Sequence, residues 1–151
     1  MSPEFYSILI LIHVLAMAVW FAGGFFIAGD VKKSIALGSS HLKSMVARAN
    51  AAERLSTISG MLTAISGFAL VFAGGGFAAQ PARIHIGLAL TILTLFITAL
   101  FTNSTMRRIA GIVERNGDLA EAAAHAKRLS MFAGIEHLLK TIIMALMVVR
   151  F

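Results

Sequence analysis

The stretch LIHVLAMAVWFAGGFF, residues 11–26, decides the fold class, because it is apolar enough to lie in a lipid bilayer. It belongs to an apolar run over about residues 5–29, and a membrane-spanning helix needs roughly 20 such residues. The run follows Glu4 rather than a basic segment, and it is too long for the apolar part of a signal peptide. It therefore predicts a retained first membrane helix, which unusually carries a histidine, His13.

The composition of the whole chain agrees with a lipid environment. Of 151 residues, 58% are hydrophobic and 13% charged, and the mean hydropathy is +0.86, which is rare for a soluble domain. The chain has no cysteine, which excludes disulfides, iron–sulfur clusters and thiolate metal sites. The formal net charge of +6 comes from basic residues between the apolar runs, which membrane topology explains better than nucleic-acid binding. We expect a single transmembrane domain over residues 1–151, with the lipid bilayer and no nucleic acid as partner.

Three further apolar runs are long enough to cross a membrane. They cover about residues 55–79, 84–102 and 129–149. The turn between the second and third helices is short, whereas the two other connections, residues 30–54 and 103–128, are long and rich in lysine and arginine. By the positive-inside rule, we expect both long connections to be cytoplasmic and both termini to lie outside.

The alanine-rich ends of the long connections predict that the second and fourth helices extend into the cytoplasm as amphipathic stems. These stems contain an internal repeat, because AAERLSTISG (51–60) aligns without gaps to HAKRLSMFAG (125–134). Repeated hairpins of the same orientation are related by an axis along the membrane normal. The predicted fold class is all-α, an integral membrane four-helix bundle built from two parallel-related helical hairpins. A chance similarity between two alanine-rich helix starts is the alternative.

Two histidines lie at a similar predicted depth on the first and third helices. His13 precedes Asp30, and His85 precedes Asn103, by nearly the same number of residues. At about 1.5 Å per residue, both imidazoles lie roughly 26 Å from the cytoplasmic boundary, in the outer leaflet. Because an ionisable group in a membrane is a functional candidate, and imidazole is a good ligand for haem iron, we predict haem b with His13 and His85 as axial ligands. Neutral histidines that hydrogen-bond to neighbouring helices are the alternative.

Four nearby residues suit such a cofactor. Arg83 lies near the outer interface, as a partner for a haem propionate or as a simple interfacial anchor. Trp20 shares a helix face with His13, two turns further on, and packs either against the ring edge or against another helix. Gly23 and Gly24 allow helices or the macrocycle to approach closely.

His137 is a less favoured metal ligand, because it lies in the cytoplasmic half of the fourth helix, far below His13. We expect Glu136 and Lys140 to pair at spacing i, i+4, with His137 as a polar neighbour. The eight methionines raise a copper hypothesis, since thioethers select Cu(I). They are scattered, however, and methionine is a common filler of helix contacts.

The first helix resembles that of a family of small bacterial four-helix membrane proteins. HVLAMAVWFAGGFF follows the pattern H-x6-W-x-A/G-G of the HemJ-type protoporphyrinogen oxidases and the related CopD-like proteins, and RIHIGLAL is similar to the start of their third helix. The resemblance implies a four-helix membrane protein that binds haem b, with His13 and His85 at the matching positions. Ala28-Gly29 and Gly87 stand where the oxidases carry a proline–arginine pair and a lysine, which removes cations that would serve substrate carboxylates or proton transfer.

The favoured function is therefore electron transfer by a b-type haem protein, a cytochrome or a haem-dependent membrane oxidoreductase, with a membrane quinol as donor. The alternatives are an enzyme that oxidises a porphyrinogen like the protoporphyrinogen oxidases, a copper-related transporter, and a structural subunit whose histidines only join helices. The small-residue stretch SGMLTAISG, with Gly60 and Gly67 on one face, also favours a homodimer.

Overall fold

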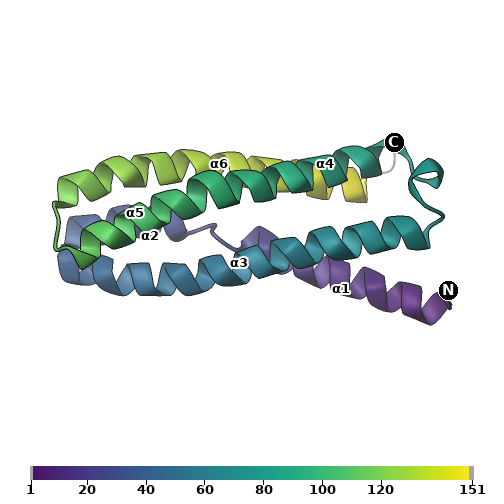
Figure 1. The fold of residues 1–151 in the computed structure, drawn as a ribbon, viewed down its shortest axis with the longest axis horizontal. Coiled ribbons are helices and arrows are strands. Elements are labelled where there is room, and N and C mark those ends of the chain that lie inside the picture. Colours follow the sequence, from purple (N-terminus) through teal and green to yellow (C-terminus); the bar gives the residue numbers. More distant parts are fainter. Residues whose placement is uncertain (1, 150–151) are drawn as a thin grey trace.

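The computed structural model describes residues 2–149, and within that range it contains helices and no strands. Four helical arms run antiparallel along one long axis (Figure 1). The first arm consists of α1 (Pro3–Ala22) and α2 (Ile27–Leu37), and the second is α3 (Ser39–Ala73). After the short 3-10 helix η1 (Phe77–Ala79), the third arm contains α4 (Ala82–Ile97), the π-helix η2 (Thr98–Thr102) and α5 (Asn103–Glu114), and the fourth is α6 (Leu119–Val148). The predicted all-α, four-helix plan is confirmed.

Each arm contains a stretch that is long and apolar enough to cross a membrane. Many large apolar side chains of these stretches point away from the protein, among them Ile58, Phe96 and Leu138, which are all more than 60% exposed. A water-soluble bundle buries such side chains, whereas a bilayer solvates them. The four arms therefore indicate a multi-pass membrane protein.

The two ends of the bundle differ in charge. The basic end, formed by α2, α5 and the first halves of α3 and α6, carries most of the cationic side chains: Lys32, Lys33, Lys43, Arg48, Arg54, Arg107, Arg108, Arg115, Lys127 and Arg128. The terminal end holds η1, the start of α1 and the end of α6 (Figure 1). Arg83 lies at this end, and Arg150 lies outside the described residues.

The basic end has a hydrophobic core. Leu42, Ile109 and Leu129, from three different helices, are at most 1% exposed, and Val31 of α2 joins them. Four helices thus pack here as in a soluble four-helix bundle. The predicted extension of the second and fourth helices beyond their apolar runs is confirmed, since α3 begins at Ser39 and α6 at Leu119. The first and third arms also extend beyond their apolar runs, through α2 and α5, which the sequence pattern did not predict.

The half toward the terminal end has a polar interior. Its buried positions include the hydroxyl side chains of Ser59, Thr63, Ser66, Thr91, Thr94 and Thr98. Four of these hydroxyls donate hydrogen bonds of 2.6–2.8 Å to carbonyls in the preceding turn of their own helices. This satisfies each proton without a partner from another helix and leaves the hydroxyl oxygen free to accept.

Two arms are not regular helices throughout. The apolar run at residues 5–29 is interrupted between Ala22 and Ile27, where Gly24 adopts a φ of +82°. Glycine tolerates this left-handed conformation better than any other residue. Gly23 allows close approach to α3, because a Cβ atom on it would lie 2.6 Å from the Cβ of Ser56. The third arm contains the five-residue π-helix η2 between α4 and α5.

Candidate functional site

His13 projects from α1 toward α3 and is half-buried. Its Nδ1 lies 2.9 Å from the Oγ of Ser66, and the Ser66 hydroxyl donates its proton to the Leu62 carbonyl, 2.6 Å away. Because the serine has only one proton, its oxygen accepts the hydrogen bond from Nδ1–H of His13. A neutral imidazole protonated on Nδ1 carries its lone pair on Nε2. His13 is therefore held in a fixed orientation, with Nε2 able to bind a metal.

Gly67 makes room for the His13 ring. A Cβ atom on Gly67 would lie 3.3 Å from Cε1 of His13 and 3.7 Å from a methyl carbon of Leu88. Leu88 follows His85 by about one turn of α4. His13 and Leu88 thus lie beside the same point of α3, and His85 lies about one turn further toward the start of α4.

His85 contacts the η1 segment. Its ring is exposed and stacks on Phe77 with 5.9 Å between centroids, and its Nε2 donates a hydrogen bond of 3.1 Å to the Phe77 carbonyl. These contacts hold the His85 ring against the turn rather than against His13. Arg83 lies two residues before His85, in the first turn of α4, and is half-buried.

The other three residues expected near the haem lie further from the terminal end. Trp20 is fully buried, and a Cβ atom on Gly60 would lie 2.7 Å from its Nε1, so its indole packs against α3 at the centre of the bundle. Gly23 and Gly24 form the break between α1 and α2. The structure therefore supports the helix-packing interpretation of Trp20 and the close-approach role of Gly23, and it places neither beside His13.

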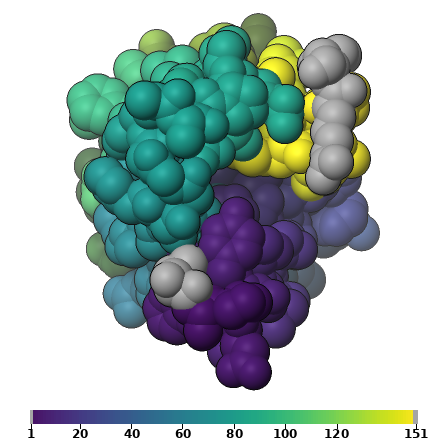
Figure 2. All heavy atoms as spheres, turned by 90° about the vertical axis from the view of Figure 1, so that its right-hand side faces the viewer, coloured from purple at the N-terminus to yellow at the C-terminus, as the bar shows by residue number. Residues whose placement is uncertain are grey.

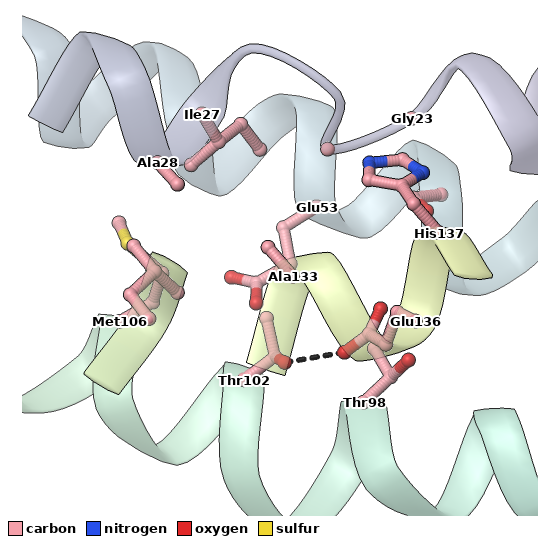
Figure 3. Close-up of a pocket in the computed structure, with 13 residues that line it drawn as sticks. Gly23, Ile27, Ala28, Glu53, Thr98, Thr102, Met106, Ala133, Glu136 and His137 are labelled. Atoms are coloured by element: carbon pink, nitrogen blue, oxygen red, sulfur yellow. Dashed lines mark hydrogen bonds between the residues drawn. The ribbon is translucent and has the colours of Figure 1, made fainter. Parts of the chain in front are cut away.

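A pocket lies where the α1–α2 break faces η2 (Figure 3). Its cavity of about 30 Å³ is partly open to the surroundings and has room for water-sized ligands. Its polar lining comes from α3, η2 and α6, through Glu53, Ser56, Thr98, Thr102, Glu136 and His137. This pocket brings together residues that are far apart in the sequence.

Hydrogen bonds hold only part of the pocket lining in place. Glu136 is buried and accepts a hydrogen bond from the Thr102 hydroxyl (Figure 3). By contrast, Glu53 Oε1 and His137 Nδ1 are buried without a hydrogen-bond partner among the described residues. The His137 ring packs edge-on against Phe25, with 4.9 Å between ring centroids. The pocket thus contains polar atoms that remain available to a small ligand.

Lys140 does not form the ion pair expected from its spacing to Glu136. Its Nζ instead donates a hydrogen bond of 3.0 Å to the carbonyl of Trp20 and lies 5.1 Å from the centre of the Trp20 ring. The physical reason is the end of α1 at Ala22, since a carbonyl in the last turn of a helix has no intrahelical partner. A buried ammonium group satisfies that carbonyl, so the predicted Glu136–Lys140 pair is wrong as a direct contact.

Glu53 was missed as a site residue. It lies next to Arg54 in a charged, alanine-rich segment, which is typical of a solvated stem. It reaches the same pocket as Glu136 only because α3 and α6 both pack against α2 and α5, next to the break after Ala22. The only feature of the sequence that could have indicated a role for Glu53 is its position just before the apolar run at residues 55–79.

The described residues, 2–149, contain no group of three or more His, Asp or Glu side chains arranged to hold a metal ion. Comparisons with protein-family models, with curated proteins and with solved structures gave no match. The function must therefore be inferred from the chemistry of these two regions, the histidines near the terminal end and the pocket at the α1–α2 break.

Proposed function

We propose that this protein is a b-type haem protein of a bacterial inner membrane that transfers electrons, with His13 as an axial ligand of the iron. The observation that carries the proposal is the hydrogen bond between His13 Nδ1 and Ser66, which fixes the ring and leaves the lone pair on Nε2. Histidines that bind metals usually donate their other ring N–H to an oxygen in this way. Haem suits a site with few protein ligands, because the porphyrin supplies the remaining donors to iron.

The proposed position of the haem is beside α1, in the half of the bundle toward the terminal end. This helix packs chiefly against α3 and makes few contacts with α6. Viewed from the terminal end, the surface is hollowed between α1 and the last turns of α6 (Figure 2). The exposed side of α1 carries aliphatic side chains such as Ile10 and Val14, which suit the apolar faces of a porphyrin.

His85 is the proposed second axial ligand. Leu88, one turn beyond it, lies beside the same glycine of α3 as His13. Coordination requires the His85 ring to leave the Phe77 carbonyl, and an exposed hydrogen bond of this kind contributes only about 0.5–1.5 kcal/mol. Arg83, in the first turn of α4, is the proposed partner of a haem propionate.

The two-hairpin repeat is part of the same proposal. The packing of α1 on α3 and of α4 on α6 is the most extensive in the bundle, which supports two hairpins as the units. Arg54 and Arg128, with the Leu-Ser that follows each, then occupy equivalent positions in α3 and α6. An axis that relates the two hairpins also relates α1 to α4, so that His13 and His85 lie on equivalent helices.

The positive-inside rule assigns the basic end to the cytoplasm and the histidines to the outer half of the membrane. Haem supplies a one-electron carrier when bound, and two imidazole ligands favour electron transfer because they leave no open position on the iron. His13 and His85 hold that carrier close to one face, too far from the other face to carry electrons across the whole bilayer. A membrane-soluble quinol is therefore the proposed donor.

The test is an absorption spectrum of the protein, produced with ample haem, purified in detergent, and recorded after air oxidation and after dithionite reduction. We expect a sharp Soret band and split visible bands, as given by low-spin, six-coordinate haem. His13→Ala is expected to lose the haem, and Ser66→Ala to weaken its binding about 10–100-fold, the usual effect of removing a partner of a metal-binding histidine.

His85→Ala is expected to lose the low-spin bands, whereas His41→Ala, at an exposed position of the basic end, is the matched control and leaves the spectrum unchanged. The proposal would be overturned by a wild-type protein without Soret absorption. Full haem content in both His13→Ala and His85→Ala would overturn the assignment of the ligands.

A further inference from the structure

Two departures from regular helix meet at one pocket. The α1–α2 break supplies Gly23 and Gly24 on one side, and η2 supplies Thr98 and Thr102 on the other (Figure 3). Non-helical backbone at membrane depth occurs where it is buried in protein or lines a cavity, and π-helical turns are frequent at functional sites. The backbone is thus irregular on both sides of a pocket that the haem proposal does not use.

The pocket holds more acidic than basic groups. Glu53 of α3 and Glu136 of α6 both line it, and Lys140 is the buried cation near Glu136. The residues that the α1–α2 break, α2 and η2 contribute to the lining are uncharged, and His137 adds an imidazole from α6. Arg107 of α5 is an exposed cation whose charge attracts the Glu53 carboxylate. Two carboxylates in a low-dielectric site with one buried ammonium are best neutralised by one bound proton.

Unpartnered atoms also indicate a missing hydrogen. Glu53 Oε1 and His137 Nδ1 are buried without a hydrogen-bond partner among the described residues. A proton on the Glu53 carboxyl group, and a water molecule at His137 that can either donate or accept, supply the partners that these atoms lack. A metal ion would need several converging ligands, and the described residues form no such group of three.

The two carboxyl groups differ in access. Glu53 is half-buried and lies on the side of the basic end, whereas Glu136 is 6% exposed and is held by Thr102. An entering proton therefore meets Glu53 first. Hydroxyl groups such as those of Thr98 and Thr102 can both donate to an ionised carboxylate and accept from a protonated one.

We propose that this pocket is a proton-exchange site, in which Glu53 and Glu136 share one proton that is taken up from water at the basic end. Uptake forms one O–H bond at a carboxylate oxygen and releases a water molecule from hydronium. Release reverses this step, so that no oxidant, reductant or further reactant is consumed. The site is independent of the haem, since it lies at the α1–α2 break and includes neither His13 nor His85.

The experiment is infrared difference spectroscopy of the full-length protein in liposomes, in the region of the protonated carboxyl C=O stretch. At neutral pH we expect a band equivalent to one protonated carboxyl group, which shifts to lower frequency when the water is replaced by D₂O. Glu136→Gln and Glu53→Gln are each expected to remove or displace this band. Glu121→Gln is the matched control, because Glu121 is an exposed carboxylate paired with Arg115 on the basic end, and it leaves the band unchanged.

Glu53→Asp keeps the carboxyl group and is expected to shift the band without abolishing it, which separates loss of the proton from loss of the fold. The absence of a protonated-carboxyl band in the wild type would overturn the proposal, as would a band that persists unshifted in both glutamine variants. Loss of the band on adding sodium but not choline at constant pH would also overturn it, since the pocket would then bind a metal cation. None of these measurements requires haem, so the two proposals fail separately.

Discussion

The basic end and the membrane-spanning half of this protein bury opposite kinds of side chain. At the basic end, Leu42 and Ile109 are fully buried, and the lysines and arginines surround them. In the spanning half, Leu138 is 61% exposed, while Thr94 and Lys140 are buried. The same four helical arms thus have an apolar core at the basic end, as in a soluble protein. In the membrane-spanning half they have a partly polar interior, and their apolar side chains face the lipid.

The comparison shows which forces act in each half. Removal of apolar surface from water stabilises the basic end, and its strength follows the buried area. Lipid offers no such gain, so helices in the spanning half associate through close packing and hydrogen bonds. The contact of Trp20 with Gly60 and the bond from Lys140 to Trp20 are contacts of this second kind.

The largest expected difference between the halves concerns leucine truncation. Leu42→Ala removes a fully buried side chain from the hydrophobic core and is expected to lower the free energy of unfolding by about 2–5 kcal/mol. Leu138→Ala, on the lipid-exposed face of α6, is the matched control and is expected to change it by less than about 0.5 kcal/mol. Chemical unfolding of both variants in the same detergent measures the two values. An equal decrease in the free energy of unfolding in both variants would contradict the conclusion that only the basic end has a hydrophobic core.

The arms themselves were predictable, because apolar runs and the distribution of lysine and arginine report directly on a membrane. The extension of α3 was also visible, since its alanine-rich start favours helix. The break at Gly23 and Gly24 was harder to predict, because the apolar run continues through Phe25 and Phe26 and hydropathy does not distinguish a broken helix from a continuous one. The π-helix η2 has no local signal at all, since its residues are ordinary helix or strand formers.

For the candidate sites, the sequence predicted only the depth of a side chain along the bundle, because depth depends on the rise per residue of a helix. Rise along an axis predicts a similar depth for His13 and His85, and the structure places Leu88, one turn beyond His85, beside the same glycine as His13. Ring orientation depends on the turn, and His85 stacks on Phe77 instead of pointing to His13. Lys140 shows the same limit, because its partner is a carbonyl that exists only where α1 ends.

A second, smaller difference between the halves concerns lysine. Lys140→Met removes the bond to the Trp20 carbonyl and leaves Glu136 without its buried cation, so it is expected to cost about 1.5–3 kcal/mol, as for a hydrogen bond made by a charged group. Lys127→Met, an exposed position on the basic part of the same helix, is expected to change stability by less than about 0.5 kcal/mol. Thermal unfolding in detergent compares the two variants. A Lys140→Met protein as stable as Lys127→Met would show that the buried ammonium group does not join α6 to α1.

The last expected difference concerns two helical glycines. A Cβ atom on Gly60 would lie 2.7 Å from Nε1 of Trp20 and 2.8 Å from a methyl carbon of Leu95, so Gly60→Ala must move one of these side chains and is expected to cost about 1–3 kcal/mol. A Cβ atom on Gly111, at the basic end, meets no atom within 4 Å, and Gly111→Ala is expected to stabilise the protein by about 0.4–1 kcal/mol through the unfolded chain. Because both variants replace glycine by alanine, a loss of stability at Gly60 and a gain at Gly111 would measure the effect of the close contact between Gly60 and Trp20. If both variants instead gain stability in thermal unfolding, Trp20 can move without loss, and the spanning half must be held together by its hydrogen bonds rather than by close packing.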